Sequence, residues 1–238
     1  MIDRSLNYGR AWISRFLAEA GPLHSVLDLG AGSGHDLLAA RVVAPKCRLL
    51  GVETLPPAQK ALRSLGIQVI DRDLETDRLP LKDASQDVVM LNQVLEHTKE
   101  IFWIHQEATR VLKPGGSLIV GVPNLASLHN RFLLLCGRQP TAIKPLSAHV
   151  RGFTKHDYMG FLNGAYPGGY ELAGYGGSNF YPFPGFLAKP LARLYPNMAW
   201  GIFFRLVKRG PYHNEFVDYL KKNPLETNYR QTAGGRKS

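Results

Sequence analysis

Apolar runs alternate with amphipathic stretches through the first half of the chain. The runs are continuous, which is typical of strands in a parallel sheet that is covered on both faces. They predict strands over 25–29, 48–53, 67–71, 87–92 and 117–122. Helices are predicted before and between these strands, over 8–20, 37–43, 57–65 and 99–112. This order of elements predicts an α/β fold with an open, doubly wound sheet.

The pattern changes after Pro123. Helices are predicted over 125–135, over 154–162 with Thr154 as the cap, and over 186–194, and two final strands over 169–174 and 200–209. We therefore expect one domain over 1–210, with an insertion at about 124–184. A basic tail follows at 211–238, and we expect it to have little structure and to be disordered over 233–238.

The composition is that of a globular protein, with 45% hydrophobic and 20% charged residues. Cys47 and Cys136 show no disulfide or metal-ligand spacing, so we expect a reducing, cytoplasmic compartment and no metal site. No secretory signal or membrane-spanning segment is expected. The net charge is +10, of which the stretch Arg205–Ser238 supplies +5 from eight Lys/Arg and three Asp/Glu. That stretch is either a solvated tail or an attraction for an anionic partner such as RNA, an acidic lipid surface or a phosphorylated substrate.

The most informative stretch is Val26–Gly34, where an apolar strand leads into a loop with glycine at 30, 32 and 34. Such a loop lets the backbone approach a ligand closely, and the helix that follows offers free N–H groups. The dinucleotide fingerprint requires a third glycine at the position of His35, so the loop departs from that pattern.

Three carboxylates narrow the choice of nucleotide. Glu53 ends the second strand, where it can accept both ribose hydroxyls, and Asp73 follows the third strand, where it can accept a hydrogen bond from adenine N6. Asp28 lies inside the apolar first strand, which is costly for a carboxylate unless it faces a cation. S-adenosylmethionine, which has an adenosine, a positive charge and no pyrophosphate, satisfies all three.

Five motifs in register make the chain similar to class I S-adenosylmethionine-dependent methyltransferases, in the small-molecule group that includes ubiquinone- and biotin-pathway enzymes. They cover about residues 20–124 and lie at Val26–Gly34, Gly51–Glu53, Asp73–Pro80, Asp87–His97 and Arg110–Gly116. Gln86 departs from the pattern, since the family usually has an aromatic residue there. The resemblance implies a Rossmann-like seven-stranded sheet, mostly parallel with strand seven antiparallel.

The resemblance also implies roles for particular residues. The Gly30, Ala31 and Gly32 backbone would line the methionine and ribose, and Asp28 would help to hold the methionine amino group. Glu53 would bind the ribose hydroxyls with Thr54 beside it. Asp73 and the Leu74 N–H would bind adenine, and Asn92 and Gln93 would form the floor near the methyl group.

The acceptor of the methyl group is less defined. A hydroxyl acceptor benefits from a base, and His97, His129, His149 and His156 are the candidates. We rank His149 first and His97 second, although each also fits a packing, capping or surface role. The insertion is expected to bind the acceptor. Its aromatic residues either line that pocket or form a second core layer.

We therefore expect O-methylation of a small molecule, such as a saccharide, a lipid-linked compound or a quinone-like compound. The alternatives are an RNA or protein methyltransferase, which the basic tail would favour, and a catalytically inactive binding subunit. The chain has no separate nucleic-acid-binding domain and no nucleobase methylation motif, so nucleic acid is an unfavoured partner. The basic and apolar residues of Phe186–Lys208 suggest peripheral contact with a membrane surface.

Overall fold

The computed structural model describes residues 3–223. One sheet of seven strands runs through it, in the order β3-β2-β1-β4-β5-β7-β6. The strands are β1 Ser25–Leu29, β2 Arg48–Val52, β3 Gln68–Ile70, β4 Gln86–Asn92, β5 Leu112–Pro123, β6 Tyr170–Ser178 and β7 Gly201–Lys208. β1 to β5 pair in parallel, and β7 pairs antiparallel with both β5 and β6. The expected mostly parallel sheet with an antiparallel seventh strand is confirmed.

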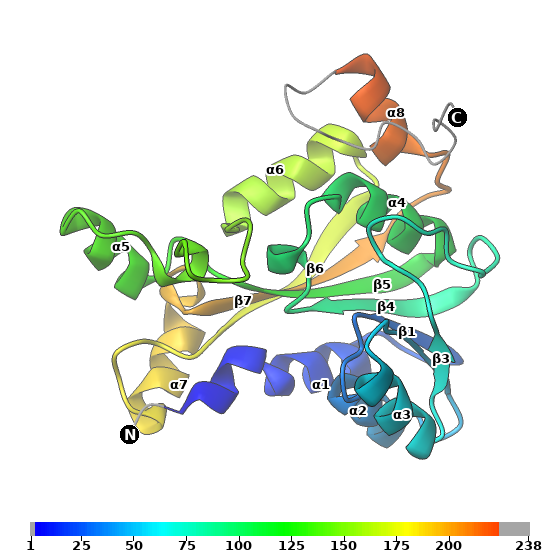
Figure 1. Cartoon of the computed structure of the whole chain (residues 1–238), viewed down its shortest axis with the longest axis horizontal. Coiled ribbons are helices and arrows are strands. Elements are labelled where there is room, and N and C mark those ends of the chain that lie inside the picture. The colour runs from blue at the N-terminus through cyan, green and yellow to red at the C-terminus, as the bar shows by residue number, and fades with distance from the viewer. Residues whose placement is uncertain (1–2, 224–238) are drawn as a thin grey trace.

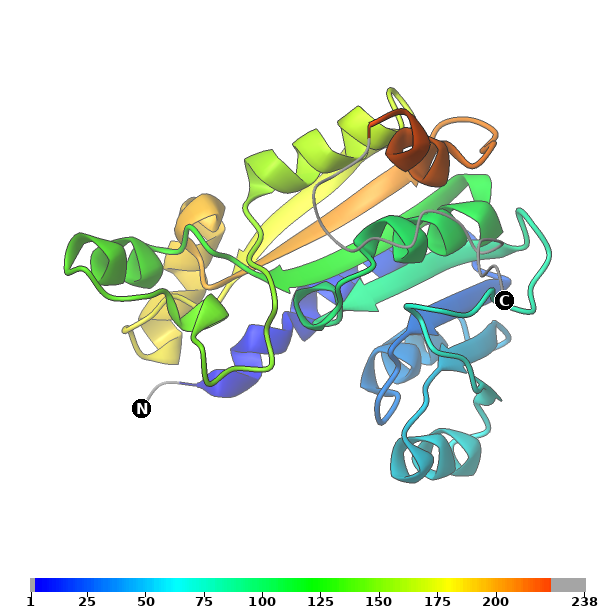
Figure 2. The ribbon, with the colours of Figure 1, turned by 45° about the horizontal axis from the view of Figure 1, so that its top comes forward.

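Helices cover both faces of the sheet (Figure 1). They are α1 Arg10–Glu19, α2 His35–Val43, α3 Pro56–Ser64, α4 Ile101–Val111, α5 Leu128–Leu135, α6 Lys155–Ala165, α7 Gly185–Leu194 and α8 Glu215–Lys222. α1, α2 and α3 lie on one face, and α4, α6 and α8 lie on the other. α5 and α7 extend beyond the sheet at one end, and α5 projects away from the body of the protein (Figure 2).

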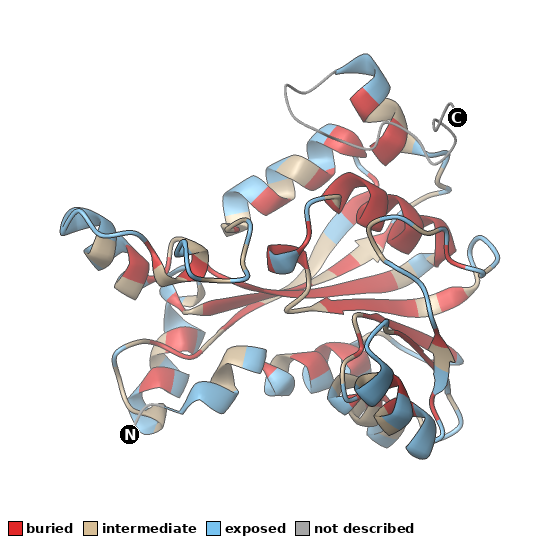
Figure 3. Cartoon of the chain, in the orientation of Figure 1, coloured by how far each residue is buried: buried red, intermediate tan, exposed pale blue. Residues whose placement is uncertain are grey.

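Successive residues of the central strands enter different cores. Val88 and Met90 of β4 pack with the α1–α3 side, whereas Val89 and Leu91 pack with the α4–α6 side. Because both faces are covered, each of these strands is apolar along its length, as Figure 3 shows by the buried centre of the sheet. This is the physical origin of the continuous apolar runs.

Several expected elements differ from the structure. The first helix is interrupted at Gly9, which has a φ of +55° and whose Cβ, if present, would lie 2.0 Å from the Phe203 ring. β5 begins at Leu112 and continues directly from α4, and β6 extends to Ser178. The expectation of little structure beyond Pro211 is wrong for α8, and the expected disorder over 233–238 lies outside the described residues.

α8 forms because its apolar residues share one helical face. Phe216, Val217 and Leu220 are buried, and Phe216 and Leu220 belong to the core beside α4 and α6. Acidic residues occupy its first turn and lysines its last, which complements the helix dipole. The packed core therefore includes residues beyond Pro211, in the segment that the sequence predicted to be a tail.

Candidate functional site

The glycine loop lies at the carboxyl ends of the parallel strands. Gly30, Gly32 and Gly34 have positive φ angles of 76°, 50° and 83°. The backbone N–H groups of Gly30 and Ala31 both donate to the Val52 carbonyl at 3.0 Å, which fastens the loop to the end of β2. A Cβ at Gly30 would lie 2.7 Å from Val94 Cγ2, so glycine is required by contact as well as by conformation.

One cavity of about 230 Å³ opens on one side of this loop. Six of the predicted cofactor residues line it: Asp28, Gly30, Ala31, Gly32, Asn92 and Gln93. Asp28 is only 4% exposed, and its pKa is raised well above 3.8 by burial and then by Asp36 and Glu53 nearby. Its carboxylate accepts no hydrogen bond from residues 3–223, so a bound cation would relieve an unfavourable burial.

A second cavity of about 180 Å³ shares Gly30 with the first. Glu53, Thr54, Asp73 and Leu74 line it, so all ten predicted cofactor residues lie around the two cavities. Glu53 Oε2 accepts from Gly32 N at 2.9 Å, and Asp73 Oδ1 accepts from Glu75 N at 2.8 Å. Each carboxylate is thereby oriented at the edge of the cavity.

The floor of the first cavity carries unsatisfied polar atoms. Asn92 Nδ2 donates to Asp36 Oδ2 at 2.7 Å and to the Tyr8 carbonyl at 3.1 Å. Asn92 Oδ1 and Gln93 Nε2 are buried without a hydrogen-bond partner among the described residues. Gln93 also has a φ of +59°, a strained conformation that is common at binding sites.

The acidic lining is more extensive than the sequence indicated. Asp36, on the first turn of α2, lies in the first cavity with Tyr8 and Arg10. Burial raises the pKa of Asp36, and the Asn92 hydrogen bond and the Arg10 charge oppose that rise. Tyr8 and Arg10 come from the N-terminal segment, more than eighty residues from Asn92, and no local pattern could have placed them there.

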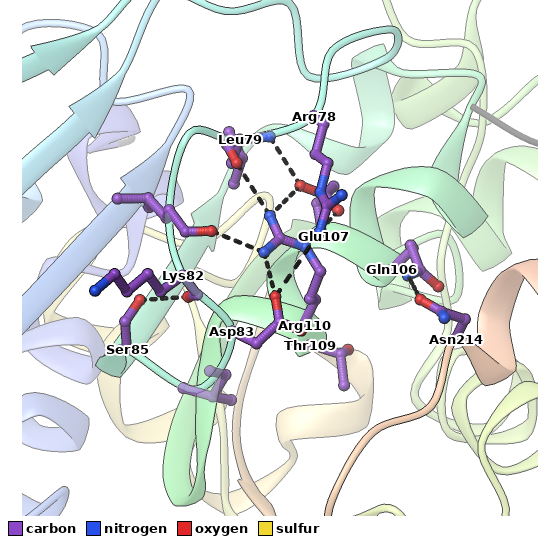
Figure 4. A network of polar contacts seen from close by, with 12 residues as sticks. Arg78, Leu79, Lys82, Asp83, Ser85, Gln106, Glu107, Thr109, Arg110 and Asn214 are labelled. Carbon is purple, nitrogen blue, oxygen red and sulfur yellow. Dashed lines mark hydrogen bonds and ion pairs between the residues drawn. The ribbon is translucent and has the colours of Figure 1, made fainter. Parts of the chain in front are cut away.

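A buried ion pair anchors the loop that follows Asp73 (Figure 4). Arg110 of α4 pairs with Glu107 at 2.6 Å, and its guanidinium also donates to the carbonyls of Leu79 and Leu81. Glu107 Oε2 accepts from Leu79 N at 2.8 Å, and Arg110 also pairs with Asp83 at 2.6 Å. The loop at 79–83 is thereby fixed to α4.

The two favoured histidines meet in space. The rings of His97 and His149 are 4.6 Å apart and nearly perpendicular, at 80°. His97 follows β4 in a 3-10 helix at Leu95–His97, and His149 belongs to the loop between α5 and α6. Burial, followed by the charge of His149, lowers the pKa of His97. The adjacent Glu96 lies in the Asp87–His97 motif, although the sequence assigned no role to it. It is buried, and burial raises its pKa to about 8.

The other two histidines lie apart from this pair. His129 on α5 faces Tyr181 at 6.0 Å, and His156 is exposed on α6. Most aromatic residues of the insertion belong to cores instead of a pocket. Tyr158, Tyr166, Tyr170 and Phe180 are buried in them. β6, expected within the insertion, is the edge strand of the sheet.

The fold and the site together define a class of protein, an α/β nucleotide-binding domain whose acidic cavity suits a cationic adenosine derivative. The comparisons with known proteins agree. Residues 27–120 match the family model described as "Methyltransferase domain". A probable S-adenosylmethionine-dependent methyltransferase of Mycolicibacterium smegmatis is 34% identical over 155 residues, which are 59% of this chain and 56% of that protein.

Two further proteins illustrate the range of relatives. The malonyl-(acyl-carrier protein) O-methyltransferase of Marinomonas sp. is 30% identical over 53% of this chain and 48% of its own length. The solved structure of a possible histamine N-methyltransferase of Thermotoga maritima covers 86% of this chain and 91% of its own, with a TM-score of 0.59 and 21% identity. The chain thus spans about half the length of these two curated relatives.

Residues 27–120 thus form a methyltransferase domain, and the relatives and the fold support a class I S-adenosylmethionine-dependent methyltransferase. It is an enzyme domain, and its cofactor is S-adenosylmethionine. The buried Asp28 carboxylate and the orphaned polar atoms of Asn92 and Gln93 fit a ligand with an amino group, a carboxylate and a sulfonium charge. No helix within residues 3–223 has the length and apolar character that crossing a membrane would need.

Proposed function

We propose that this enzyme methylates an oxygen atom of a small, negatively charged acceptor. Binding of the cofactor is supported by two cavities that meet at Gly30. Asp28 lines one of them, and Glu53 and Asp73 line the other. When bound, S-adenosylmethionine supplies an activated methyl group on a sulfonium. The protein then has mainly to bind, orient and exclude water.

Each cofactor residue has a role that its position supports. Asp28 would hold the methionine amino group, and the backbone of Gly30, Ala31 and Gly32 would line the methionine and ribose. Glu53, beside Thr54, would accept the ribose hydroxyls. Asp73 and the Leu74 N–H would bind adenine, for which Asp73 Oδ2 remains after Oδ1 has accepted from Glu75 N. Asn92 and Gln93 would close the floor.

His149, with His97 beside it, is proposed to act on the acceptor hydroxyl. Gln93 lines the cavity of Asp28, and Thr98 lines the cavity of Glu53. The short segment that carries His97 therefore runs from one cofactor cavity to the other. A hydroxyl placed beside the two rings would lie next to the cofactor and near a nitrogen lone pair that can take its proton.

The remainder of the acceptor is proposed to lie in a third cavity of about 630 Å³, which is lined by Asn124, Arg131, Lys155 and Tyr175 among others. Asn124 follows β5, so this cavity lies at the same edge of the sheet as the cofactor cavities. None of its described lining residues is acidic, and the Lys155 ammonium lies 4.4 Å from the centre of the Tyr175 ring. These features favour a carboxylate or phosphate on the acceptor.

A peripheral membrane contact is part of the same proposal, because lipid-linked acceptors are reached at a surface. Phe186 and Leu194 of α7 are 76% and 71% exposed, and Lys189 and Arg193 lie on the same helix. The membrane contact was expected over Phe186–Lys208, but β7 within that range is buried in the sheet. The proposed contact is therefore limited to α7. Vesicles of anionic phospholipid should sediment the wild-type chain, and a Phe186→Ser/Leu194→Ser variant should sediment less. Equal sedimentation would exclude this contact.

The cellular compartment is proposed to be reducing and cytoplasmic, since Cys47 and Cys136 are both free thiols. An RNA or protein acceptor, and a binding role without catalysis, remain alternatives that no feature of the described structure favours over the small-molecule acceptor.

Two measurements test the function. Calorimetric titration with S-adenosylmethionine and S-adenosylhomocysteine should show one site, and no binding at millimolar ligand would overturn the proposal. Tritiated methyl groups should then enter the lipid or saccharide fraction of an extract of the source cells. Label confined to RNA or protein would replace the small-molecule acceptor with the alternative.

A further inference from the structure

Three side chains with metal-binding chemistry converge beside the cofactor cavities. Glu96, His97 and His149 each offer a donor atom, and the three atoms lie within 4.8 Å of one another. They come from two segments more than fifty residues apart. We propose that these three side chains bind one divalent transition-metal ion, such as Zn²⁺, with a coordination position open to the acceptor. This replaces the expectation of no metal site.

The hydrogen bonds of both imidazoles leave the same nitrogen free. Nδ1 of His97 lies 3.3 Å from the Ala148 carbonyl, and Nδ1 of His149 lies 2.9 Å from the Ala142 carbonyl. A carbonyl can only accept, so each Nδ1 carries the proton and each Nε2 presents its lone pair. Metal-binding histidines are held in this way, with one nitrogen on a backbone carbonyl and the other on the metal.

Glu96 provides the independent evidence for a cation. The residue is 1% exposed, and its Oε2 is buried without a hydrogen-bond partner among the described residues. A buried carboxyl oxygen without a partner is unfavourable, because it has lost its water and gained nothing in exchange. A metal ion between Glu96 and the two rings supplies the missing partner.

The loop that carries His149 is fixed by its backbone contacts. Val150 N donates to the Glu96 carbonyl at 2.8 Å. The Arg151 guanidinium donates to the carbonyls of Thr98 at 3.0 Å and Lys99 at 2.7 Å. These bonds join the two residues that follow His149 to the 96–99 segment. The three ligands therefore have a preorganised arrangement, which favours tight binding.

The donor set selects the kind of metal. Two imidazole nitrogens and one carboxylate suit Zn²⁺, Co²⁺, Mn²⁺ or Fe²⁺, whereas Mg²⁺ and Ca²⁺ prefer oxygen ligands. His97 is exposed and His149 is half-buried, so one side of the cluster is accessible. With a metal bound, both Nε2 lone pairs are occupied, so the metal takes over the role proposed above for the imidazole base. An acceptor hydroxyl bound to the metal would have a lowered pKa and would release its proton to solvent. That catalytic role rests on the proposed function, but metal binding itself does not.

Co²⁺ is the probe for the experiment, because its visible absorption reports coordination by protein ligands. The untagged full chain, stripped with a chelator, should bind one equivalent of Co²⁺, and Zn²⁺ should displace it. Glu96→Gln and His149→Ala should each weaken binding at least tenfold, while His24→Ala, an exposed histidine outside the cluster, should not. Thermal unfolding of each variant verifies that it is folded.

The outcomes separate the two proposals. Binding without one-to-one stoichiometry, or binding that survives both cluster variants, would overturn the metal site. Cofactor binding measured in the same preparations is independent of it. If S-adenosylmethionine binds and Co²⁺ does not, the metal inference alone fails. If Co²⁺ binds and S-adenosylmethionine does not, the proposed function fails.

Discussion

Glu53 gives the most direct test of how the cofactor is placed. Its Oε2 accepts from Gly32 N, and its Oε1 accepts from Thr54 N and Leu55 N, all at 2.9 Å. The carboxylate therefore joins the glycine loop to the end of β2 at the point where the ribose is proposed to bind. Replacing Glu53 with alanine removes both the ribose ligand and this connection.

The structure allows the size of the effect to be worked out. A hydrogen bond to a charged group contributes about 1.5–3 kcal/mol. Glu53 is half-buried, so solvent screening favours the lower part of that range, about 1.5–2 kcal/mol. We expect Glu53→Ala to raise the Kd for S-adenosylmethionine by roughly 10- to 30-fold at 25 °C. Isothermal titration calorimetry, with S-adenosylhomocysteine as a second ligand, measures this directly.

A matched variant distinguishes loss of the ligand from loss of the loop. Glu53→Gln keeps the size and a neutral acceptor, so it should weaken binding less than alanine does. Asp218→Asn, on the exposed face of α8, should leave the Kd unchanged, because its one ion pair within residues 3–223 is with Lys221. An unchanged affinity in folded Glu53→Ala protein would show that the ribose lies elsewhere.

Three further predictions concern buried polar groups. Burial raises the pKa of Asp28. As the pH rises through that pKa, the carboxyl group becomes charged, so affinity for the cationic cofactor should rise and the stability of the ligand-free protein should fall. Asp28→Asn should abolish both trends, as measured by calorimetry and by Tm against pH. Arg110→Met leaves the buried Glu107 carboxylate without its ion-pair partner. It should lower the free energy of unfolding by about 3–5 kcal/mol, which corresponds to roughly 6–20 °C in Tm. Adding Glu107→Gln should recover part of this loss, and no recovery would contradict the pairing argument. Gln86 is 2% exposed, and its Oε1 has no hydrogen-bond partner in the described part of the chain. Gln86→Met should therefore change the free energy of unfolding in urea by less than about 1 kcal/mol, and a larger loss would reveal a missed partner.

The parallel part of the fold was predictable because its signal is local. Strands β1, β2 and β4 are covered on both faces, so apolar residues occupy successive positions along them and form continuous runs in the sequence. α8 was missed because its apolar stripe is only three residues long and lies among charges that suggested a solvated tail. Helix α8 is stable through its packing on the core, and such packing has no local sequence signature.

The candidate site also contains residues that the local sequence predicts and residues that only long-range packing places. Asp28, Glu53 and Asp73 could be found because strand ends in a parallel sheet converge on one edge, so a carboxylate at a strand end has a predictable place. Arg10 reaches the same cavity only because α1 packs beneath the sheet. His149 meets His97 only because the loop before α6 returns to the segment that follows β4. These contacts are long-range, and the sequence alone does not specify them.

The distribution of charge connects the two halves of the proposed reaction. Residues 1–122 hold fourteen Lys or Arg and fourteen Asp or Glu, whereas residues 123–214 hold ten and two. In the neutral half, the carboxylates of Asp28, Asp36 and Glu53 lie around the two cavities proposed for a cationic cofactor. In the cationic half, Arg131 and Lys155 line the cavity proposed for the acceptor. The two cofactor cavities therefore favour a cationic methyl donor, and the acceptor cavity at the same sheet edge favours an anionic acceptor. Charge alone would reduce binding of the donor in the acceptor cavity and of the acceptor in the cofactor cavities.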